Sequence, residues 1–258
     1  MISIKSNREI ELMKEAGRIT ALVHEVLKSE IKPGVTTEYL DRLAYKTILE
    51  NSCTPSFLGL YDFPKSICTS VNEQIVHGIP DSKIVLKNGD IVSVDVGACF
   101  KGYHGDSAWT YPVGEISQEA KDLLYHTKKA LFEGLKQVKA GVRVGDVSNC
   151  IGNYAYNHGY SVPLEYTGHG IGTAMHEDPV VPNYGEANKG PVLKAGMTLA
   201  IEPMFHIGKP FTKVLADDWT VITKDRSLAA HFEHTVLVLE DGYEILTKNI
   251  EEDHSFNE

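Results

Sequence analysis

The segment Val85-Leu-Lys-Asn-Gly-Asp-Ile-Val-Ser-Val-Asp95 recurs later in the chain as Val192-Leu-Lys-Ala-Gly-Met-Thr-Leu-Ala-Ile-Glu202. The two segments begin at positions 85 and 192, so they are 107 positions apart. Lys32-Pro-Gly-Val35 and Lys139-Ala-Gly-Val142 match at the same spacing. Two matches that share one spacing favour an internal duplication over chance. Asp95 and Glu202 occupy equivalent positions in the two copies, and each occurs in an apolar strand pattern.

Two helical patterns precede the strand in each copy. In the first copy, Ser6 and Glu9 have the spacing of a capping box, and Thr36 or Thr37 can cap a second helix. In the second copy, Ser117 is expected to open a helix that Gly141 ends, and residues 146–158 form another. The order helix, helix, strand therefore occurs twice.

The organisation of the chain follows from this repeat. No linker rich in Pro, Gly or Ser separates the two copies. We therefore expect an α/β (α+β) fold in which one domain spans residues 1–258. Its two pseudo-repeats cover approximately residues 6–115 and 116–245.

Composition excludes several classes of protein. The chain has 258 residues, of which 42% are hydrophobic and 23% charged, so it is expected to fold and be soluble. A formal charge of −10 would repel phosphate backbones, which argues against direct nucleic-acid recognition and is compatible with a monomer. The N-terminus lacks the apolar stretch of a signal peptide, and no run approaches the roughly 18 apolar residues of a membrane span. Four widely spaced cysteines are typical of free thiols, so we expect a cytoplasmic protein without membrane contact.

Asp95 and Asp106 lie in two strand patterns that the turn residues Lys101 and Gly102 connect. A loop of two or four residues makes the two acids diagonal neighbours on one face, with backbones roughly 7 to 8 Å apart. A three-residue loop places them on opposite faces. Two exposed, solvated acids are the alternative, but the valines around Asp95 argue for burial, and buried acids need a partner such as a cation.

Three further residues are a histidine or acids that lie beside apolar or glycine-rich sequence. His169 is flanked by glycines, Glu202 ends an apolar run, and Glu233 enters a strand rich in Val and Leu. Four carboxylates and one imidazole suit a pair of divalent ions such as Mn, Fe, Co or Zn. The sequence contains no phosphate-binding GxxxxGK[ST] loop, no GxSxG nucleophile motif and no HExxH.

Six ordered motifs carry a resemblance to a known family: HGIP at 77–80, VDVG at 94–97, HGD at 104–106, TGHGIG at 167–172, IEP at 201–203 and EHT at 233–235. Together they resemble the type I methionine aminopeptidases of bacteria, nearly from end to end. The resemblance implies the pita-bread fold, in which two pseudo-symmetric helix-helix-strand halves surround a central antiparallel sheet. It also implies an enzyme that removes the N-terminal methionine of nascent polypeptides when the second residue is small.

The resemblance further implies a dinuclear centre of Mn, Co, Fe or Zn, with no choice among these metals. The implied ligands are Asp95, Asp106, His169, Glu202 and Glu233, with Asp106 and Glu233 bridging the two ions.

The catalytic and substrate-binding roles also come from the resemblance. Glu202 would carry a proton to the leaving amine, His176 would hydrogen-bond the substrate carbonyl and its oxyanion, and His77 would contact the cleaved amide. Phe63, Cys68 and Trp219 would receive the methionine side chain.

The sequence departs from familiar members of the family at Phe57, Leu60 and Met175, which leaves the details of substrate and inhibitor preference open. Two alternatives also remain at this point. One is a proline-directed aminopeptidase or prolidase of the same fold, although such enzymes usually carry an additional N-terminal domain. The other is a non-catalytic member that binds nascent chains. An enzyme acting on new chains would be expected to work near the ribosome.

Overall fold

The structure, a computed structural model, describes residues 2–248, so residues 1 and 249–258 of the predicted domain lie outside the described part. The helices and strands of residues 2–248 are α1 (Asn7–Glu30), α2 (Thr37–Glu50), β1 (Thr54–Pro55), the 3-10 turn η1 (Leu60–Asp62), β2 (Ile67–Val71), β3 (Gln74–Val76), β4 (Ile91–Phe100), β5 (Tyr103–Pro112), α3 (Gln118–Leu135), α4 (Val144–Asn157), β6 (Gly168–Gly170), β7 (Glu177–Val181), β8 (Thr198–Ile201), β9 (Met204–His206), β10 (Thr212–Val214), β11 (Val221–Thr223), β12 (Ala229–His231), β13 (His234–Leu239) and β14 (Gly242–Ile245).

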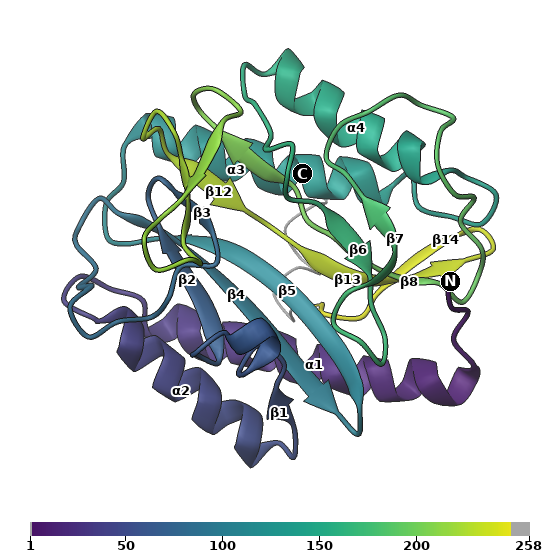
Figure 1. Ribbon diagram of the computed structural model, residues 1–258, viewed down its shortest axis with the longest axis horizontal. Helices are drawn as coiled ribbons and strands as arrows, with labels where there is room; N and C mark the ends of the chain where they lie inside the picture. The colour runs from purple at the N-terminus through teal and green to yellow at the C-terminus, as the bar shows by residue number, and fades with distance from the viewer. Residues whose placement is uncertain (1, 249–258) are drawn as a thin grey trace.

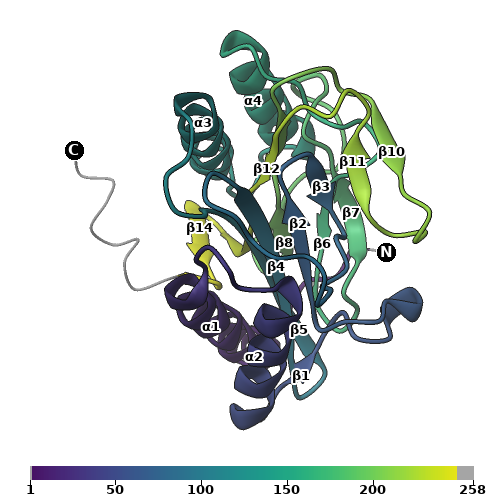
Figure 2. The ribbon, with the colours of Figure 1, turned by 90° about the vertical axis from the view of Figure 1, so that its left-hand side faces the viewer.

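The helices form two pairs at opposite ends of the molecule, α1 with α2 and α3 with α4, with the strands between them (Figures 1 and 2). Helix α1 begins at the predicted capping box of Ser6 and Glu9. The side chain of Thr36, not Thr37, caps α2. Apolar side chains of α1, α2 and β4 form the core of the first half. A second core joins α3 and α4 to the strands of the second half.

Two helix boundaries in the second half differ from the sequence prediction. Helix α3 begins after Ser117 as expected but ends at Leu135, six residues before Gly141. The reason is that the backbone N–H of Gly141 donates to the carbonyl of Leu193, in the segment leading to β8, and does not continue the helix. Helix α4 begins at Val144, two residues before the predicted start, because Asp146 accepts from the backbone N–H preceding the helix.

The duplication is visible in equivalent contacts of the two halves. Isolated bridges pair Thr36 with Val85 and Arg143 with Val192, and each residue of the second pair lies 107 positions after its counterpart. In both halves the loop between the helices is thus held against the segment that leads into the central strand. This confirms the predicted pair of similar helix-helix-strand halves.

The strands of each half form an antiparallel sheet. In the first half, β4 pairs with β1, β2 and β5, and in the second the order is β14-β13-β8-β6-β7. The β4–β5 turn consists of the two residues Lys101 and Gly102, whose φ values of +48° and +84° suit a tight hairpin. The register therefore places Asp95 opposite Ala108 and Asp106 opposite Gly97, as the two-residue loop predicts. Two smaller sheets, β12-β9 and β10-β11-β3, complete the described strands.

The two large sheets meet where β5 passes β12 and β13 (Figure 1). We call this contact the seam. There Thr235 Oγ1 accepts from the backbone N–H of Asp106 at 3.0 Å and donates to its carbonyl at 2.8 Å. The N–H of Glu233 donates to the carbonyl of Ala108 at 2.8 Å. The seam therefore brings Asp106 of one half beside Glu233 of the other.

None of the helices in residues 2–248 combines the length and apolarity that crossing a bilayer requires.

Candidate metal centre

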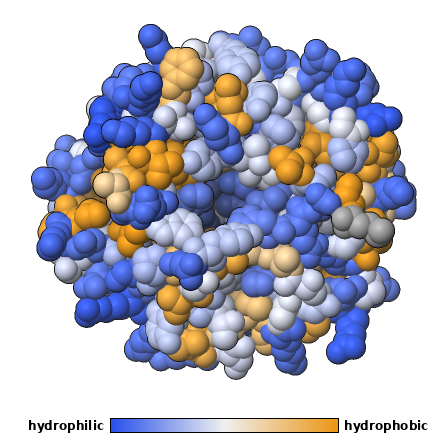
Figure 3. All heavy atoms as spheres, viewed as in Figure 1, coloured by the Kyte–Doolittle hydropathy of each residue, from blue (hydrophilic) through white to orange (hydrophobic). Residues whose placement is uncertain are grey.

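A cavity of about 300 Å³ lies between the two halves and opens as a hollow near the middle of the face shown in Figure 3. Every residue that the sequence analysis assigned to the site lines it. These residues are Phe63, Cys68, His77, Asp95, Asp106, His169, His176, Glu202, Trp219 and Glu233. Phe57 and Leu60 also line the cavity, whereas Met175 packs with Phe57 in an adjoining apolar cluster. The fold thus collects residues that are far apart in the sequence.

Strand alternation directs the two aspartates into the cavity. Val94 and Val96 on β4 point into the first core, so Asp95 between them points the opposite way. The hairpin register places Asp106 on the same side of the sheet. Asp106 is buried and Asp95 is half-buried, and one carboxylate oxygen of each lacks a hydrogen-bond partner within the described residues.

The glycines around His169 allow β6 to fit tightly between β7 and β8. A Cβ at Gly168 would lie 2.4 Å from the carbonyl oxygen of Ala200, and one at Gly170 would lie 2.1 Å from that of Asp178. Nδ1 of His169 donates to the carbonyl of Gly170 at 2.8 Å, because a carbonyl oxygen can only accept. This bond leaves Nε2 unprotonated and facing the carboxylates, the usual arrangement of a metal-binding histidine.

The four acids line one cavity, in which Asp106 and Glu233 are buried and Asp95 and Glu202 are half-buried. Burial raises the pKa of Asp106, Glu202 and Glu233 well above the ordinary range, and neighbouring carboxylates raise the pKa of Asp106 and Glu233 further. Burial likewise raises the pKa of Asp95 from 3.8 to about 6. Ionised carboxylates at this density need a cation among them. The unpartnered oxygens of Asp95, Asp106 and Glu233 are the atoms available to bind one.

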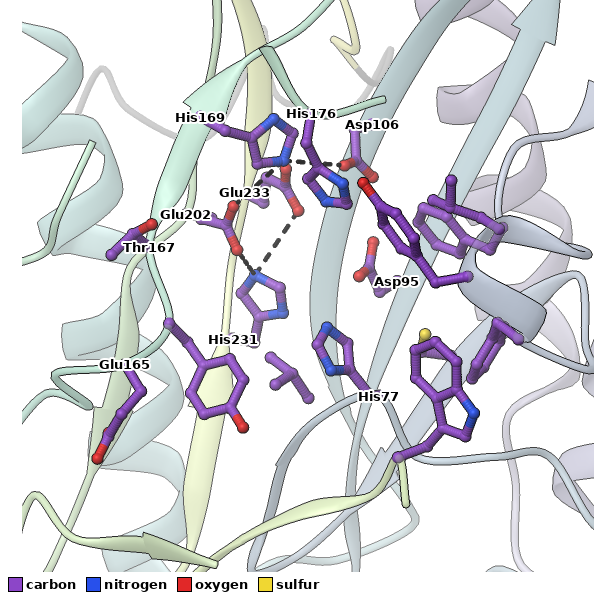
Figure 4. A pocket seen from close by; sticks show the side chains of 18 residues that line it. His77, Asp95, Asp106, Glu165, Thr167, His169, His176, Glu202, His231 and Glu233 are labelled. Atoms are coloured by element: carbon purple, nitrogen blue, oxygen red, sulfur yellow. Dashed lines mark ion pairs between the residues drawn. The ribbon is translucent and has the colours of Figure 1, made fainter. Parts of the chain in front are cut away.

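Two histidine nitrogens face these acids (Figure 4). Nε2 of His169 lies 3.7 Å from Oδ2 of Asp106 and 3.6 Å from Oε1 of Glu202. Nε2 of His231 lies 3.4 Å from Oε2 of Glu202 and 3.6 Å from Oε2 of Glu233. The potential ligand atoms form two groups with all distances within 4.8 Å: Asp106, His169 and Glu233, and Glu202, His231 and Glu233. Asp95 lies beside these groups in the same cavity.

His231 is absent from the sequence prediction. A signal was available, because His231 precedes Glu233 by two positions and alternate residues of an extended chain share one face. The other cavity-lining residues that the sequence analysis missed are Tyr61, Val76, Glu165, Tyr166 and Thr167.

Aromatic side chains form the apolar end of the cavity. The rings of Phe63 and Trp219 meet edge to face with centroids 5.0 Å apart, and Cys68 belongs to the same buried cluster. The ring centroid of His77 lies 6.2 Å from that of Trp219 and 5.8 Å from that of Tyr166, and both pairs are edge to face. Burial lowers the pKa of His77 from 6.5 to about 4, so its ring is neutral near pH 7. A long apolar group with a polar attachment would fit this end.

His176 stands on the other side of Asp95 from His77 in the view of Figure 4. Its ring lies 4.5 Å from the ring of His169 and stacks on Tyr61 with centroids 6.0 Å apart. Burial lowers the pKa of His176, which favours the neutral imidazole. A neutral imidazole beside the carboxylate group can donate one N–H to a bound oxygen.

Comparisons with known proteins agree with this geometry. A model of metallopeptidase family M24 matches residues 11–240. The chain is 54% identical to methionine aminopeptidase 1 of Bacillus subtilis, over 96% of this chain and all of the relative. A crystal structure of a methionine aminopeptidase from Thermotoga maritima superposes with a TM-score of 0.95 at 45% identity, over 96% of this chain and 100% of that one. An Xaa-Pro dipeptidase from Bacillus anthracis gives a TM-score of 0.78 at 27% identity, over 95% of this chain and 62% of that one.

Proposed function

This chain belongs to metallopeptidase family M24 and to its methionine aminopeptidases, and from that membership we propose how its cavity carries out the reaction. The chain is a hydrolase that removes the N-terminal methionine from its substrates. One observation carries the mechanism: a buried group of carboxylates and imidazoles adjoins an aromatic, apolar end in the same cavity.

The proposed metal ligands are Asp95, Asp106, His169, Glu202 and Glu233, which would hold two divalent ions. Their fit is supported by buried oxygens of Asp95, Asp106 and Glu233 that have no partner within residues 2–248, and by the mixed oxygen and nitrogen donors. Mn, Co, Fe and Zn all suit such donors. Two bound ions supply Lewis acidity to the substrate carbonyl and a nucleophilic water-derived oxygen.

The apolar end would receive the methionine side chain. Phe63 and Trp219 offer aromatic surface, and Cys68 offers a polarisable sulfur, which together suit a thioether. His77, in contact with Trp219, would lie beside the amide that is cleaved. The stacked rings of Tyr61 and His176 lie at the same cavity, and the second residue of the substrate, which would be small, would lie beside them.

Proton transfer would use Glu202 and His176. Glu202 lines the cavity among the proposed ligands, and its carboxylate would accept a proton and return it to the leaving amine nitrogen. The neutral ring of His176 would donate its N–H to the substrate carbonyl oxygen as negative charge develops there.

We place this activity on nascent polypeptides in the cytoplasm, near the ribosome, by a monomer that forms one structural domain. The seam between the halves supports the single domain, because its bonds connect them at the site. Proline-directed hydrolysis and a non-catalytic binding role are not favoured. The chain is far more similar to methionine aminopeptidases than to the Xaa-Pro dipeptidase, and it retains all five expected ligand residues.

The test is release of free methionine from Met-Gly-Met-Met by metal-stripped protein, before and after addition of Mn²⁺ or Co²⁺. We expect release only with metal, and no cleavage of a matched Gly-Pro dipeptide. Cleavage of the proline peptide alone would establish the first alternative. Bound metal without cleavage of either peptide would establish the second.

A further inference from the structure

His231 occupies the floor of the cavity without a hydrogen-bond partner for its Nε2 atom among the described residues. The side chain is 2% exposed. A buried polar nitrogen left unpaired typically costs about 1 to 3 kcal/mol, so such atoms usually have a partner in the working protein. The question is which partner the surroundings of this nitrogen would accept.

The backbone of His231 is held firmly at the seam. Its N–H donates to Oγ1 of Thr110 at 2.9 Å, and the same hydroxyl donates to its carbonyl at 2.8 Å. The imidazole is therefore placed by strand β5 of the opposite half as well as by its own strand β12. These bonds position the backbone of His231, and its Nε2 faces oxygens of Glu202 and Glu233.

Distances around the two histidines are alike. Nε2 of His231 lies 3.4 and 3.6 Å from oxygens of Glu202 and Glu233, and Nε2 of His169 lies 3.6 and 3.7 Å from oxygens of Glu202 and Asp106. These separations exceed the 2.7–3.2 Å of an ordinary N–H···O hydrogen bond. They match donors that share one ion, because bonds of about 2.0 to 2.1 Å in tetrahedral geometry separate the donor atoms by about 3.4 Å.

The two histidines also use different oxygens of Glu202. Oε1 faces His169, and Oε2 faces His231. Each imidazole thus has its own set of neighbouring oxygens, and the two groups of potential ligands meet only at shared carboxylates.

We infer that Nε2 of His231 is a sixth protein ligand of the metal centre, so that each of the two ion positions has one imidazole. The inference rests on the metal centre of the proposed function and adds a ligand that the six sequence motifs do not contain. Imidazole favours Zn and Fe, whereas all-oxygen surroundings favour Mn. His231 therefore biases the ion position that lacks His169 towards Zn or Fe.

The direct test is to count the imidazoles bound to metal. Metal-stripped protein labelled with ¹⁵N at histidine is loaded with two equivalents of ¹¹³Cd²⁺, and ring nitrogens that show one-bond coupling to cadmium are identified by NMR. We expect two coupled rings, assigned to His169 and His231. One coupled ring in the cadmium-loaded, unmodified chain overturns the inference, as does a second coupled ring that persists in His231→Gln.

The comparison uses His231→Gln, His169→Gln and a matched control, His206→Gln. His206 is also a buried histidine whose Nε2 lacks a partner among the described residues, but it lies outside the cavity lining. Each of the first two variants should lose one coupled ring, and the control should lose none. The count in the unmodified chain needs no variant, so it decides the question even if a variant does not fold. Failure of the chain to bind cadmium at all would contradict the metal centre itself.

Calorimetric titration provides a second measurement. His231→Gln should weaken binding of Zn²⁺ to one of the two positions by about 10- to 100-fold. Binding of Mn²⁺ should change less. Unchanged binding of Zn²⁺ in His231→Gln would contradict the role as ligand, and equal weakening for both ions would contradict the bias towards Zn.

Discussion

In the metal-free protein the Asp95 carboxyl should contribute a fall in stability as pH rises, whereas His77, His169 and His231, whose pKa values burial lowers from 6.5 to about 4, contribute in the opposite direction. Asp95 has a pKa near 3.8 in an unfolded chain, and burial raises it to about 6 in the folded protein. The folded state therefore holds a proton that the unfolded state releases, and the free energy of unfolding decreases between these two pH values. The shift for Asp95 alone corresponds to about 3 kcal/mol. The raised pKa values of Asp106, Glu202 and Glu233 act in the same direction.

Bound metal should oppose the contribution of Asp95, because ligands are deprotonated when they coordinate. Metal at about 100 times its dissociation constant adds about 2.7 kcal/mol of stability. For a domain of this size, about 2 to 4 °C of Tm corresponds to each kcal/mol, so we expect a rise of about 5 to 10 °C near pH 7.5. Near pH 4.5 protons compete for the same oxygens, and the rise should be small.

The assay is thermal unfolding followed by circular dichroism from pH 4.5 to 7.5, with a chelator and with added Mn²⁺ or Co²⁺. Asp95→Asn is the matched variant: it removes one of the titrating groups, so the Tm of the chelated variant relative to that of the chelated unmodified chain should rise with pH. The same dependence of Tm on pH in both proteins would refute the reasoning. So would a metal-induced shift that is the same at both ends of the range.

Other changes separate metal binding, catalysis and packing. Asp106→Ala should lose bound metal and methionine release together, as elemental analysis and the peptide assay would reveal. His176→Ala should keep its metal but lower kcat by about 10²- to 10³-fold through loss of an oxyanion donor, and an unchanged kcat would contradict that role. Trp219→Ala should retain metal and lower kcat/KM for methionine peptides by about 10-fold or more, because apolar contact is lost; an unchanged ratio would remove this residue from the side-chain pocket. Gly170→Ala should cost at least about 1 to 3 kcal/mol of stability because its Cβ would lie 2.1 Å from the carbonyl oxygen of Asp178, and an unaltered denaturation midpoint would contradict the close packing.

The sequence predicts the parts of the site that depend on local rules. The two-residue turn at Lys101 and Gly102 determines the hairpin register, and the register determines that Asp95 and Asp106 share a face. The duplication is likewise detectable because equivalent contacts preserve similar residues at one spacing.

The remaining features depend on contacts between distant segments. Nothing local to Gly141 shows that its N–H bonds to Leu193 and that α3 ends earlier. The spacing of His231 to Glu233 was a local signal, but the approach of Glu202, which follows β8, to His231 is a contact between distant segments. The hydrogen bonds between the Thr235 hydroxyl and the backbone of Asp106, which join the two halves, cannot be predicted from the periodicity of the sequence.

The seam also has a consequence for how the enzyme matures. The bond between Asp106 and Thr235 joins residues 129 positions apart, and both groups of potential ligands include Glu233, beside that bond. During synthesis, Asp95 and Asp106 leave the ribosome long before their partners in the second half. An emerging chain therefore presents a pair of acids and no complete chelate. We therefore expect the complete metal centre to form only once the C-terminal strands have closed against β5, so that metal loading would report completed folding.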